Sequence, residues 1–433
     1  MREALAGLTT RGRAFLAAGL TAVGCAVLLG QPALTRVGVL IVALPLVTAA
    51  VLGRTRYKLA LVRTVTPQQV TAGQPARVHL SLTNEGRTPS GVLLLEDQVP
   101  YVLGTRPRFV VDGIARGWRR QVTYQVRSDV RGKFEIGPMN VRVNDAFGLV
   151  ELGRAFRTTV PLTVTPRTVP LPAIPLGGTW TGSGDQRPRA FASGSAEDVT
   201  VREYRHGDDL RRVHWRSSAR RGELMVRREE QPWQARATVV LDNRLLAHRG
   251  HGIASSIEAA VGAAASVAVH LSRRGYLVRL VTASGEDPTT VWHTRDPELN
   301  VRPLLEALAV ITFDQRSRLD TAWLSGQTHG GGLTVAVTGA LDSKDLPTMR
   351  RMLHQTSLGL ALALDIEAWE GGAPGASSAA PVLSQSGWRA ISLGPGDRLD
   401  AVWEELGRSS SRVRGGAMGA EPESRSTLSR DRS

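Results

Sequence analysis

Cysteine and lysine are almost absent from this sequence of 433 residues. The only cysteine, Cys25, lies inside an apolar run, so an internal disulfide is excluded and a reducing compartment fits. No thiol remains elsewhere for cysteine catalysis or for a thiolate zinc site. Because only Lys58, Lys133 and Lys344 are lysines, the net charge of +15 rests on arginine. Such a charge suits an anionic membrane surface as well as nucleic acid, and does not decide between them.

The sequence also lacks the short motifs of common enzymes. The phosphate loop G-x-x-x-x-G-K-[ST], the zinc motif H-E-x-x-H and the G-x-S-x-G elbow do not occur. A hydrolytic triad would need Ser217 or Ser218 with His214 and Asp208, but residues so close along one chain seldom meet in that geometry. We therefore predict a protein that is not an enzyme and that has no cofactor.

Two apolar runs without charge, residues 14–30 and 37–53, open the chain. Each has about the minimum length of a membrane-spanning helix. Buried core helices are the alternative, and a signal peptide is disfavoured because no A-x-A site follows the first run. Only Arg36 lies between the runs, whereas several arginines flank the pair. The positive-inside rule then predicts a hairpin anchor, residues 1–56, in the cytoplasmic membrane as a multi-pass protein, with both termini and the soluble region in the cytoplasm.

Residues 57–167 alternate apolar and polar positions between turns. In the segment "ARVHLSLTN", Val78, Leu80 and Leu82 share one face, and glycine-containing turns separate several such segments. This pattern predicts an antiparallel immunoglobulin-like β-sandwich.

Strands alternate with helices in residues 236–407. The expected strands are "ATVVLD", "YLVRLVT", "LTVAVT", "GLALAL" and "RAISL", with a helix after each except the fourth. This order predicts a parallel sheet with helices on both faces. Before it, residues 168–235 hold a proline- and glycine-rich linker and an arginine-rich segment. After it, the composition of residues 408–433 predicts a disordered tail.

Two segments carry a family resemblance. The stretch "REYRHGDDLRRVHWRSSARRGELMVRREE" resembles the signature of the bacterial domain of unknown function 58 family, and "RGKFEIGPMNVRVNDAFGLVELG" agrees with that family except that Ala146 replaces a proline. The resemblance extends along the chain up to the tail. It implies a von Willebrand factor A-like C-terminal domain of Rossmann type. It also implies work with a MoxR-type AAA+ ATPase, and with transglutaminase-like membrane proteins, in assembly or cell-envelope processes.

The resemblance further implies a metal loop, from which this sequence departs. Many von Willebrand A domains bind Mg²⁺ through D-x-S-x-S and a later aspartate, because a hard cation needs several oxygen ligands. Here Arg244 and Leu246 replace the serines after Asp242, and Gly339 stands where the later aspartate would be. An arginine would repel a divalent cation by several kcal/mol at an effective dielectric of about 20. We predict that Arg244 pairs with Asp242 in place of a metal, and that Mg²⁺ or Mn²⁺ leaves the melting temperature unchanged.

The arginine-rich segment is expected to join the domains and to bind a partner. Carboxylates interleave with its arginines, which favours internal pairing over contacts with nucleic acid. Trp215 is expected to be a buried anchor whose change to alanine costs roughly 3–5 kcal/mol, and Arg216 an exposed contact. The residues expected to be structural or partner-binding are Tyr204, Gly207, Asp208, Arg212, His214, Trp215, Arg216, Arg220, Arg227 and Glu229.

These features together predict a membrane-anchored scaffold or adaptor that acts by protein–protein binding on the cytoplasmic side. One alternative is an enzyme, or a factor associated with an enzyme, of cell-wall metabolism. A second alternative is binding of anionic lipid or nucleic acid through the arginine-rich segment. No specific nucleic acid and no small-molecule substrate is indicated.

Overall fold

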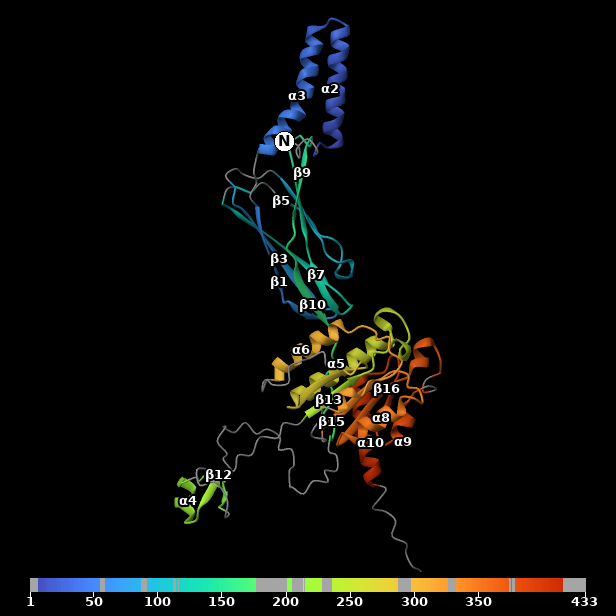
Figure 1. Cartoon of the computed structure of the whole chain (residues 1–433). Coiled ribbons are helices and arrows are strands. Elements are labelled where there is room, and N and C mark those ends of the chain that lie inside the picture. The colour runs from blue at the N-terminus through green and yellow to red at the C-terminus, as the bar shows by residue number, and fades with distance from the viewer. Residues whose placement is uncertain are drawn as a thin grey trace, which may run out of the picture. The chain divides into compact units, whose positions relative to one another are not determined.

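Figure 1 shows the computed structural model of the chain. The structure describes residues 7–54, 59–86, 92–111, 114–115, 117–145, 147–176, 201–204, 213, 215–227, 236–286, 297–325, 332–373, 375 and 378–415. The chain divides into two compact units, which are described separately. The first comprises residues 1–168, 251–265 and 302–312, and the second comprises residues 169–250, 266–301 and 313–433.

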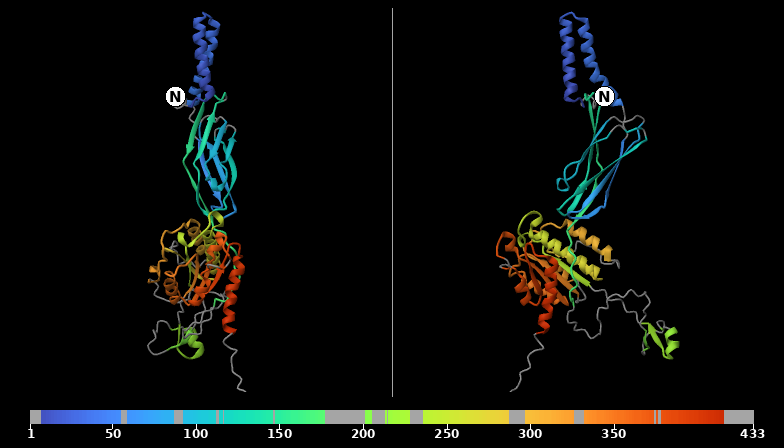
Figure 2. Two further views of the ribbon diagram at one scale, coloured as in Figure 1. Left: turned by 90° about the vertical axis from the view of Figure 1, so that its right-hand side faces the viewer. Right: turned by 180° about the vertical axis from the view of Figure 1, so that it is seen from behind.

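The N-terminal hairpin consists of α2 (Thr10–Leu28) and α3 (Pro32–Arg54), which lie side by side in every view (Figure 1, Figure 2). Both helices are long and apolar enough to cross a membrane. Glycines let their backbones approach, because a Cβ on Gly19 would lie 3.1 Å from the carbonyl oxygen of Gly38. The helices begin four and five residues before the predicted spans. A hydrogen bond from Gly12 N to Thr9 Oγ1 caps α2 ahead of its apolar run.

The middle region is rich in β-strands, as predicted. Its three sheets have the orders β1-β3-β6, β2-β10-β7 and β5-β4-β8-β9. The strands are β1 (Leu59–Thr66), β2 (Gln69–Thr71), β3 (Pro75–Asn84), β4 (Leu93–Asp97), β5 (Arg108–Val111), β6 (Arg119–Arg127), β7 (Gly132–Ile136), β8 (Met139–Asn144), β9 (Glu151–Phe156) and β10 (Val160–Thr165), with a 3-10 turn η1 (Tyr101–Leu103). Val78, Leu80 and Leu82 are fully buried in one core, so the predicted inward face of β3 is confirmed.

One strand pair of this region departs from the predicted antiparallel pattern. β2 pairs in parallel with β10. A tight hairpin imposes antiparallel pairing, but β10 comes from the far end of the region and no such turn joins it to β2.

A buried ion pair crosses the core of this region. Arg63 from β1 donates to both carboxylate oxygens of Asp97, at 2.5 and 3.2 Å, and the hydroxyl of Tyr124 donates to the same carboxylate at 2.6 Å. Burial, together with the bond to Asp97, raises the pKa of Tyr124 above its usual value. Arg63 therefore belongs to the protein core.

The C-terminal region contains a five-stranded, fully parallel sheet with the order β14-β13-β15-β16-β17. All five predicted strands are confirmed, as β13 (Arg236–Leu241), β14 (Leu277–Thr282), β15 (Leu333–Thr338), β16 (Leu358–Leu364) and β17 (Arg389–Leu393). The helices are α5 (Ser256–Arg273), α6 (Pro297–Val310), α7 (Ala322–Ser325), α8 (Leu346–His354), α9 (Ala380–Gln385) and α10 (Leu399–Gly415), and the 3-10 turns are η3 (Leu245–Ala247), η4 (Gly252–Ala254) and η5 (Ile366–Glu370). Met349, Met352 and Leu383 of α8 and α9 pack in one core cluster with the sheet.

Two predicted details of this region need correction. No helix was expected between β16 and β17, yet η5 and α9 lie there. Parallel neighbours require a crossover connection, so the pairing of these strands explains the inserted helix. In addition, α10 continues to Gly415, eight residues past the predicted domain end at 407. Residues 416–433 of the expected tail lie outside the described residues.

Part of the predicted linker is packed. The backbone N of Val169 donates to Ser266 Oγ at 3.0 Å, the indole of Trp403 to the Pro172 carbonyl at 3.2 Å, and Arg274 to the Ile174 carbonyl at 3.1 Å. Residues 169–174 thus run along α5 and α10. The proline-rich composition predicted a linker here, but not its contacts.

Candidate functional site

A buried arginine joins two aspartates at the ends of the parallel strands. Arg244 Nε and Nη2 donate to the two carboxylate oxygens of Asp242, at 2.9 and 2.8 Å. Its Nη1 donates to both oxygens of Asp345, at 2.9 and 3.1 Å. The side chains of the arginine and of the two aspartates are 4%, 0% and 2% exposed. The predicted pairing of Arg244 with Asp242 is confirmed, and we name these three residues the arginine centre.

The parallel sheet brings these residues together. Asp242 directly follows β13, and Asp345 precedes α8 after β15, so both lie at the carboxyl edge of neighbouring strands. Arg244 also donates to the Ser317 carbonyl at 3.0 Å, which fixes the loop after α6 to the same point. Asp345 was missed by the sequence analysis. The sequence feature that could have identified Asp345 is its place just before α8, the helix that follows β15, because β15 pairs with β13.

The electrostatics of the arginine centre favour a permanently charged guanidinium. Burial by itself would lower the pKa of Arg244, but hydrogen bonds and charges from Asp242 and then Asp345 outweigh it and hold that pKa above its usual value. A planar guanidinium with five donors can satisfy two carboxylates and a carbonyl at once. One positive charge against two negative charges leaves the centre with a formal charge of −1 if both carboxylates are ionised.

The loop after β13 can lie close to the end of β15 because residue 339 is a glycine. A Cβ at this position would lie 2.1 Å from the carbonyl oxygen of Ala247, and the same carbonyl accepts a hydrogen bond from Ala340 N at 2.9 Å. His248 then turns inward, where its Nε2 lies 2.6 Å from the Asp242 carbonyl oxygen. Since a carbonyl only accepts, Nε2 carries the proton. Burial is the main cause that lowers the pKa of this imidazole.

The residues present do not fit the divalent cation that the family resemblance implies. The guanidinium of Arg244 occupies the carboxylate oxygens that a cation would need, and Leu246, which is 64% exposed, offers no side-chain oxygen. Across the described ranges, no group of three or more His, Cys, Asp or Glu side chains is arranged to hold a metal.

Thr338 buries its hydroxyl at the carboxyl end of β15. Thr338, the last residue of β15, is fully buried, and its Oγ1 has no hydrogen-bond partner within the part of the chain that the structure describes. An unpaired buried hydroxyl costs stability. In the sequence, Thr338 stands out only as the last residue of a predicted strand.

The arginine-rich segment folds locally as a small strand-helix-strand unit. It contains β11 (Val201–Glu203), α4 (Trp215–Arg221) and β12 (Met225–Arg227), and β11 pairs antiparallel with β12. Tyr204 N donates to the Leu224 carbonyl at 2.8 Å. Ser218 Oγ is buried and accepts from Met225 N at 2.9 Å, which ties the helix to the second strand. Gly222, with a φ of +76°, makes the predicted turn between them.

The predicted burial of Trp215 was wrong. Trp215 is the first residue of α4 and is 71% exposed, whereas Val213, two positions earlier, is 8% exposed and bridges to Val226. The prediction assumed strand-like alternation, but the helix begins at Trp215 and turns its side chain outward. Arg216 and Arg220 are exposed on the same helix.

Several predicted site residues cannot be located. Gly207, Asp208, Arg212, His214 and Glu229 lie outside the described residues, and of Arg227 only the backbone, in β12, is described. The proposed pairing of arginines with Asp208 or Glu229 therefore stays a prediction. Ser218, one of two candidate nucleophiles, is held as an acceptor by a backbone amide.

Both parts of this candidate site fall within one family match. Residues 200–358 match the model of the family described as "Protein of unknown function DUF58". Residues 200–358 are a DUF58 region. The resemblance drawn from the signature segment is thereby confirmed. The DUF58 match includes β11, α4 and β12 together with all three residues of the arginine centre.

The comparisons with solved structures give distant likenesses. The chain is similar to the CARDB domain of the PF1109 protein from Pyrococcus furiosus, at 16% identity over 25% of this chain and 93% of that chain, with a TM-score of 0.20. It is also similar to the alkylpurine DNA glycosylase AlkC of Pseudomonas fluorescens, at 16% identity over 30% of this chain and 39% of that chain, with a TM-score of 0.16. No curated protein matches the chain.

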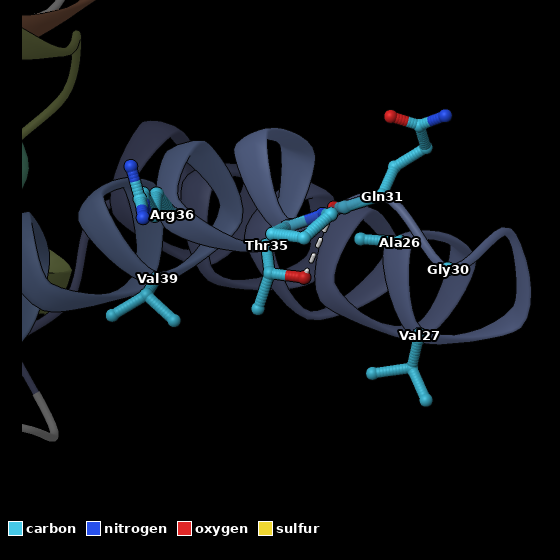
Figure 3. A pocket seen from close by; sticks show the side chains of 8 residues that line it. Ala26, Val27, Gly30, Gln31, Thr35, Arg36 and Val39 are labelled. Carbon is cyan, nitrogen blue, oxygen red and sulfur yellow. Dashed lines mark hydrogen bonds between the residues drawn. The ribbon is translucent and has the colours of Figure 1, made fainter.

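A pocket of about 680 Å³ lies at the tip of the hairpin (Figure 3). It is lined by Ala26, Val27, Gly30, Gln31, Pro32, Thr35, Arg36 and Val39. Thr35 Oγ1 is 3.3 Å from the Gln31 carbonyl, so the hydroxyl is used within the turn. Apolar side chains dominate the lining, and Arg36 is its only charged member.

Proposed function

We propose that this DUF58 protein is a membrane-anchored scaffold or adaptor that works by binding another protein. The family resemblance makes a MoxR-type AAA+ ATPase the expected partner, in assembly or cell-envelope processes. In this proposal the hairpin holds the chain in the cytoplasmic membrane, with both termini and the soluble region on the cytoplasmic side. The middle region is an immunoglobulin-like sandwich, and the parallel sheet belongs to a von Willebrand A-like domain.

The observation that carries the proposal is the exposed tryptophan of α4. Trp215 is 71% exposed, and Arg216 and Arg220 are exposed on the same helix. Tryptophan and arginine are the residue types most enriched among those that dominate protein–protein binding energy. A large apolar side chain held in water on a short, internally bonded unit is explained most simply by a partner that covers it.

The arginine centre supports a binding role for the adjoining sheet. Because Arg244 takes up the oxygens of Asp242 and Asp345, the strand-end loops are held in place by an internal cation. Leu245 and Leu246 of η3 are 41% and 64% exposed beside it. A rigid loop with exposed apolar side chains suits recognition of a protein surface.

Site-specific photo-crosslinking tests the proposal. A photoreactive phenylalanine analogue replaces Trp215 in the full chain, in native membranes, and the products are identified by mass spectrometry. Val382 of α9, an exposed apolar residue at 42%, is the control position. We expect one AAA+ ATPase to be captured from position 215 and not from position 382.

A pair of substitutions separates binding from folding. Arg216→Ala should reduce the capture, whereas Arg302→Ala, at an exposed arginine of α6, should not. Thermal unfolding of both variants should match the wild type, since changes at exposed positions usually alter stability by less than about 0.5 kcal/mol. Capture of lipid or nucleic acid alone from position 215 would refute the protein-binding role.

A further inference from the structure

The hairpin and the β region are joined by more than the covalent chain. Leu8 forms a β-bridge with Val150, and Glu151 N donates to the Gly7 carbonyl at 2.8 Å. Thr9 N donates to the Leu149 carbonyl at 2.9 Å, and Thr9 Oγ1 to the Gly148 carbonyl at 2.7 Å. The residues before α2 therefore extend the sheet edge at β9, and the first turn of α2 starts on the turn 145–150.

Side-chain packing fixes the same junction. Ala49 of α3 is 3% exposed and belongs to the same core cluster as Leu149 and Val150, and Leu8 packs against that cluster. A Cβ on Gly12 would lie 2.2 Å from the Leu149 carbonyl oxygen, so α2 touches the turn directly. α3 thus shares a core with one end of the β region, and α2 contacts the same end through Gly12; we name this end the hairpin end.

Two large aromatic side chains are exposed at the hairpin end. Phe147, 60% exposed, lies in the turn 145–150 beside the carbonyl groups that hold Thr9. Trp118 is 67% exposed, and its carbonyl accepts from Asn84 N at 3.2 Å. Asn84 in turn pairs with Leu59, the first residue of β1, which follows α3 by five residues. Trp118 therefore lies where the chain leaves the hairpin.

Positive charge accompanies these aromatic residues. Arg119 and Arg120 follow Trp118 at the start of β6 and are exposed. Arg11, in the first turn of α2, is also exposed, and its Nη1 lies 3.9 Å from the Cβ position of Gly148. Glu85 is an exposed acidic residue at the same end. Exposed aromatic rings with neighbouring arginines match the chemistry of the headgroup layer, where rings sit at the interface and arginines meet phosphates.

We infer that the hairpin end of the β region docks on the headgroup layer of the bilayer, with Trp118 and Phe147 at the interface. The inference rests on the membrane anchor in the proposed function. It goes further because it assigns a lipid-binding surface to the β region and fixes that region against the membrane. The bilayer is the occupant because both anchoring helices emerge from this end and α3 shares its core.

A position farther from the hairpin end in the same region supplies a matched control. β4 runs from Leu93, which pairs with Val143 near the turn 145–150, to Asp97, which pairs with Met139. Tyr101 follows Asp97 in the turn η1 and is 91% exposed. It is therefore an exposed aromatic residue beyond the end of β4 that lies farther from the turn 145–150.

Spin-label accessibility of the full chain in bilayer discs tests the inference. In a Cys25→Ser background, single cysteines replace Trp118, Phe147, Tyr101 and Leu40, the last being 69% exposed on α3. The discs contain phosphatidylcholine and phosphatidylglycerol, and both faces are open to water. For each label, collisions with oxygen are compared with collisions with a water-soluble nickel chelate.

We expect labels at 118 and 147 to collide with the nickel chelate several-fold less often than the label at 101, and the label at 40 to be shielded most. Equal nickel collisions at 118, 147 and 101, with position 40 shielded, would overturn the docking and leave the anchor intact. Free access of the chelate to position 40 would overturn the anchor itself. Arg119→Cys gives the same test if Trp118→Cys does not fold.

Discussion

Removing the cation of the arginine centre should destabilise the parallel sheet strongly. In Arg244→Met the side chain keeps much of its length but loses every donor, so Asp242 and Asp345 remain buried without their counter-ion. Loss of one partner from a buried ion pair typically costs about 3–5 kcal/mol, because the remaining charge stays desolvated. The value applies here since the arginine is only 4% exposed and gains little solvation in the folded state.

Hydrogen exchange read at β13 and β15 is the suitable assay, because one unfolding free energy is poorly defined for a chain with several regions. Every 1.4 kcal/mol corresponds to about a tenfold change in an opening equilibrium, so amides of these strands should exchange roughly 10²–10⁴-fold faster in the variant. Amides of β3, in the other compact unit, should be unchanged.

Two further variants decide whether charge is the cause. Asp345→Asn should cost less in the Arg244→Met background than in the wild type, with a coupling energy of about 0.5–3 kcal/mol. Arg302→Met breaks an exposed pair with Glu306 and should stay within about 0.5 kcal/mol of the wild type. A loss below about 1 kcal/mol for Arg244→Met, or additive effects in the cycle, would refute the reasoning.

Three other predictions concern the neighbours of the arginine centre. Gly339→Ala should lower stability by about 1–3 kcal/mol, seen as a lower melting temperature, because the new Cβ meets the Ala247 carbonyl. Thr338→Val should leave the melting temperature unchanged or raise it, by up to about 1 kcal/mol in stability, and a clear decrease would mean that the hydroxyl has a partner. Burial lowers the pKa of His248, so the unfolded state takes up a proton first as the pH falls below about 6.5. Stability should therefore be full above that pH and decrease below it, and His248→Gln should flatten the change in melting temperature between about pH 8 and about pH 5.5.

Local patterns in the sequence were sufficient to predict most of the helices and strands. The uncharged runs predicted α2 and α3, the alternation at Val78, Leu80 and Leu82 predicted β3, and the apolar segments predicted all five parallel strands. These patterns can be read from the sequence because each reflects which face of one helix or strand is buried. The buried face of one element repeats with a short period along consecutive residues. The signature segment was also sufficient to identify the resemblance to the DUF58 family, which the match over residues 200–358 confirmed.

Local sequence patterns could not predict the contacts between segments that are far apart in the chain. Trp215 was misjudged because one aromatic residue fits both a buried strand and an exposed helix start, and only the placement of α4 decides. Asp345 was missed because it lies 101 positions from Arg244. The parallel pairing of β2 with β10 likewise joins the two ends of one region.

The sequence by itself determined the apolar hairpin, the order of the five parallel strands, and the pairing of Arg244 with Asp242. Only the tertiary structure decided that Arg244 is shared by two aspartates, that Arg63 lies in a core, and that Phe147 and Trp118 lie at the hairpin end. The physical reason is that burial along one element follows a short period in the chain, whereas ion pairs and shared surfaces depend on which elements the fold brings together.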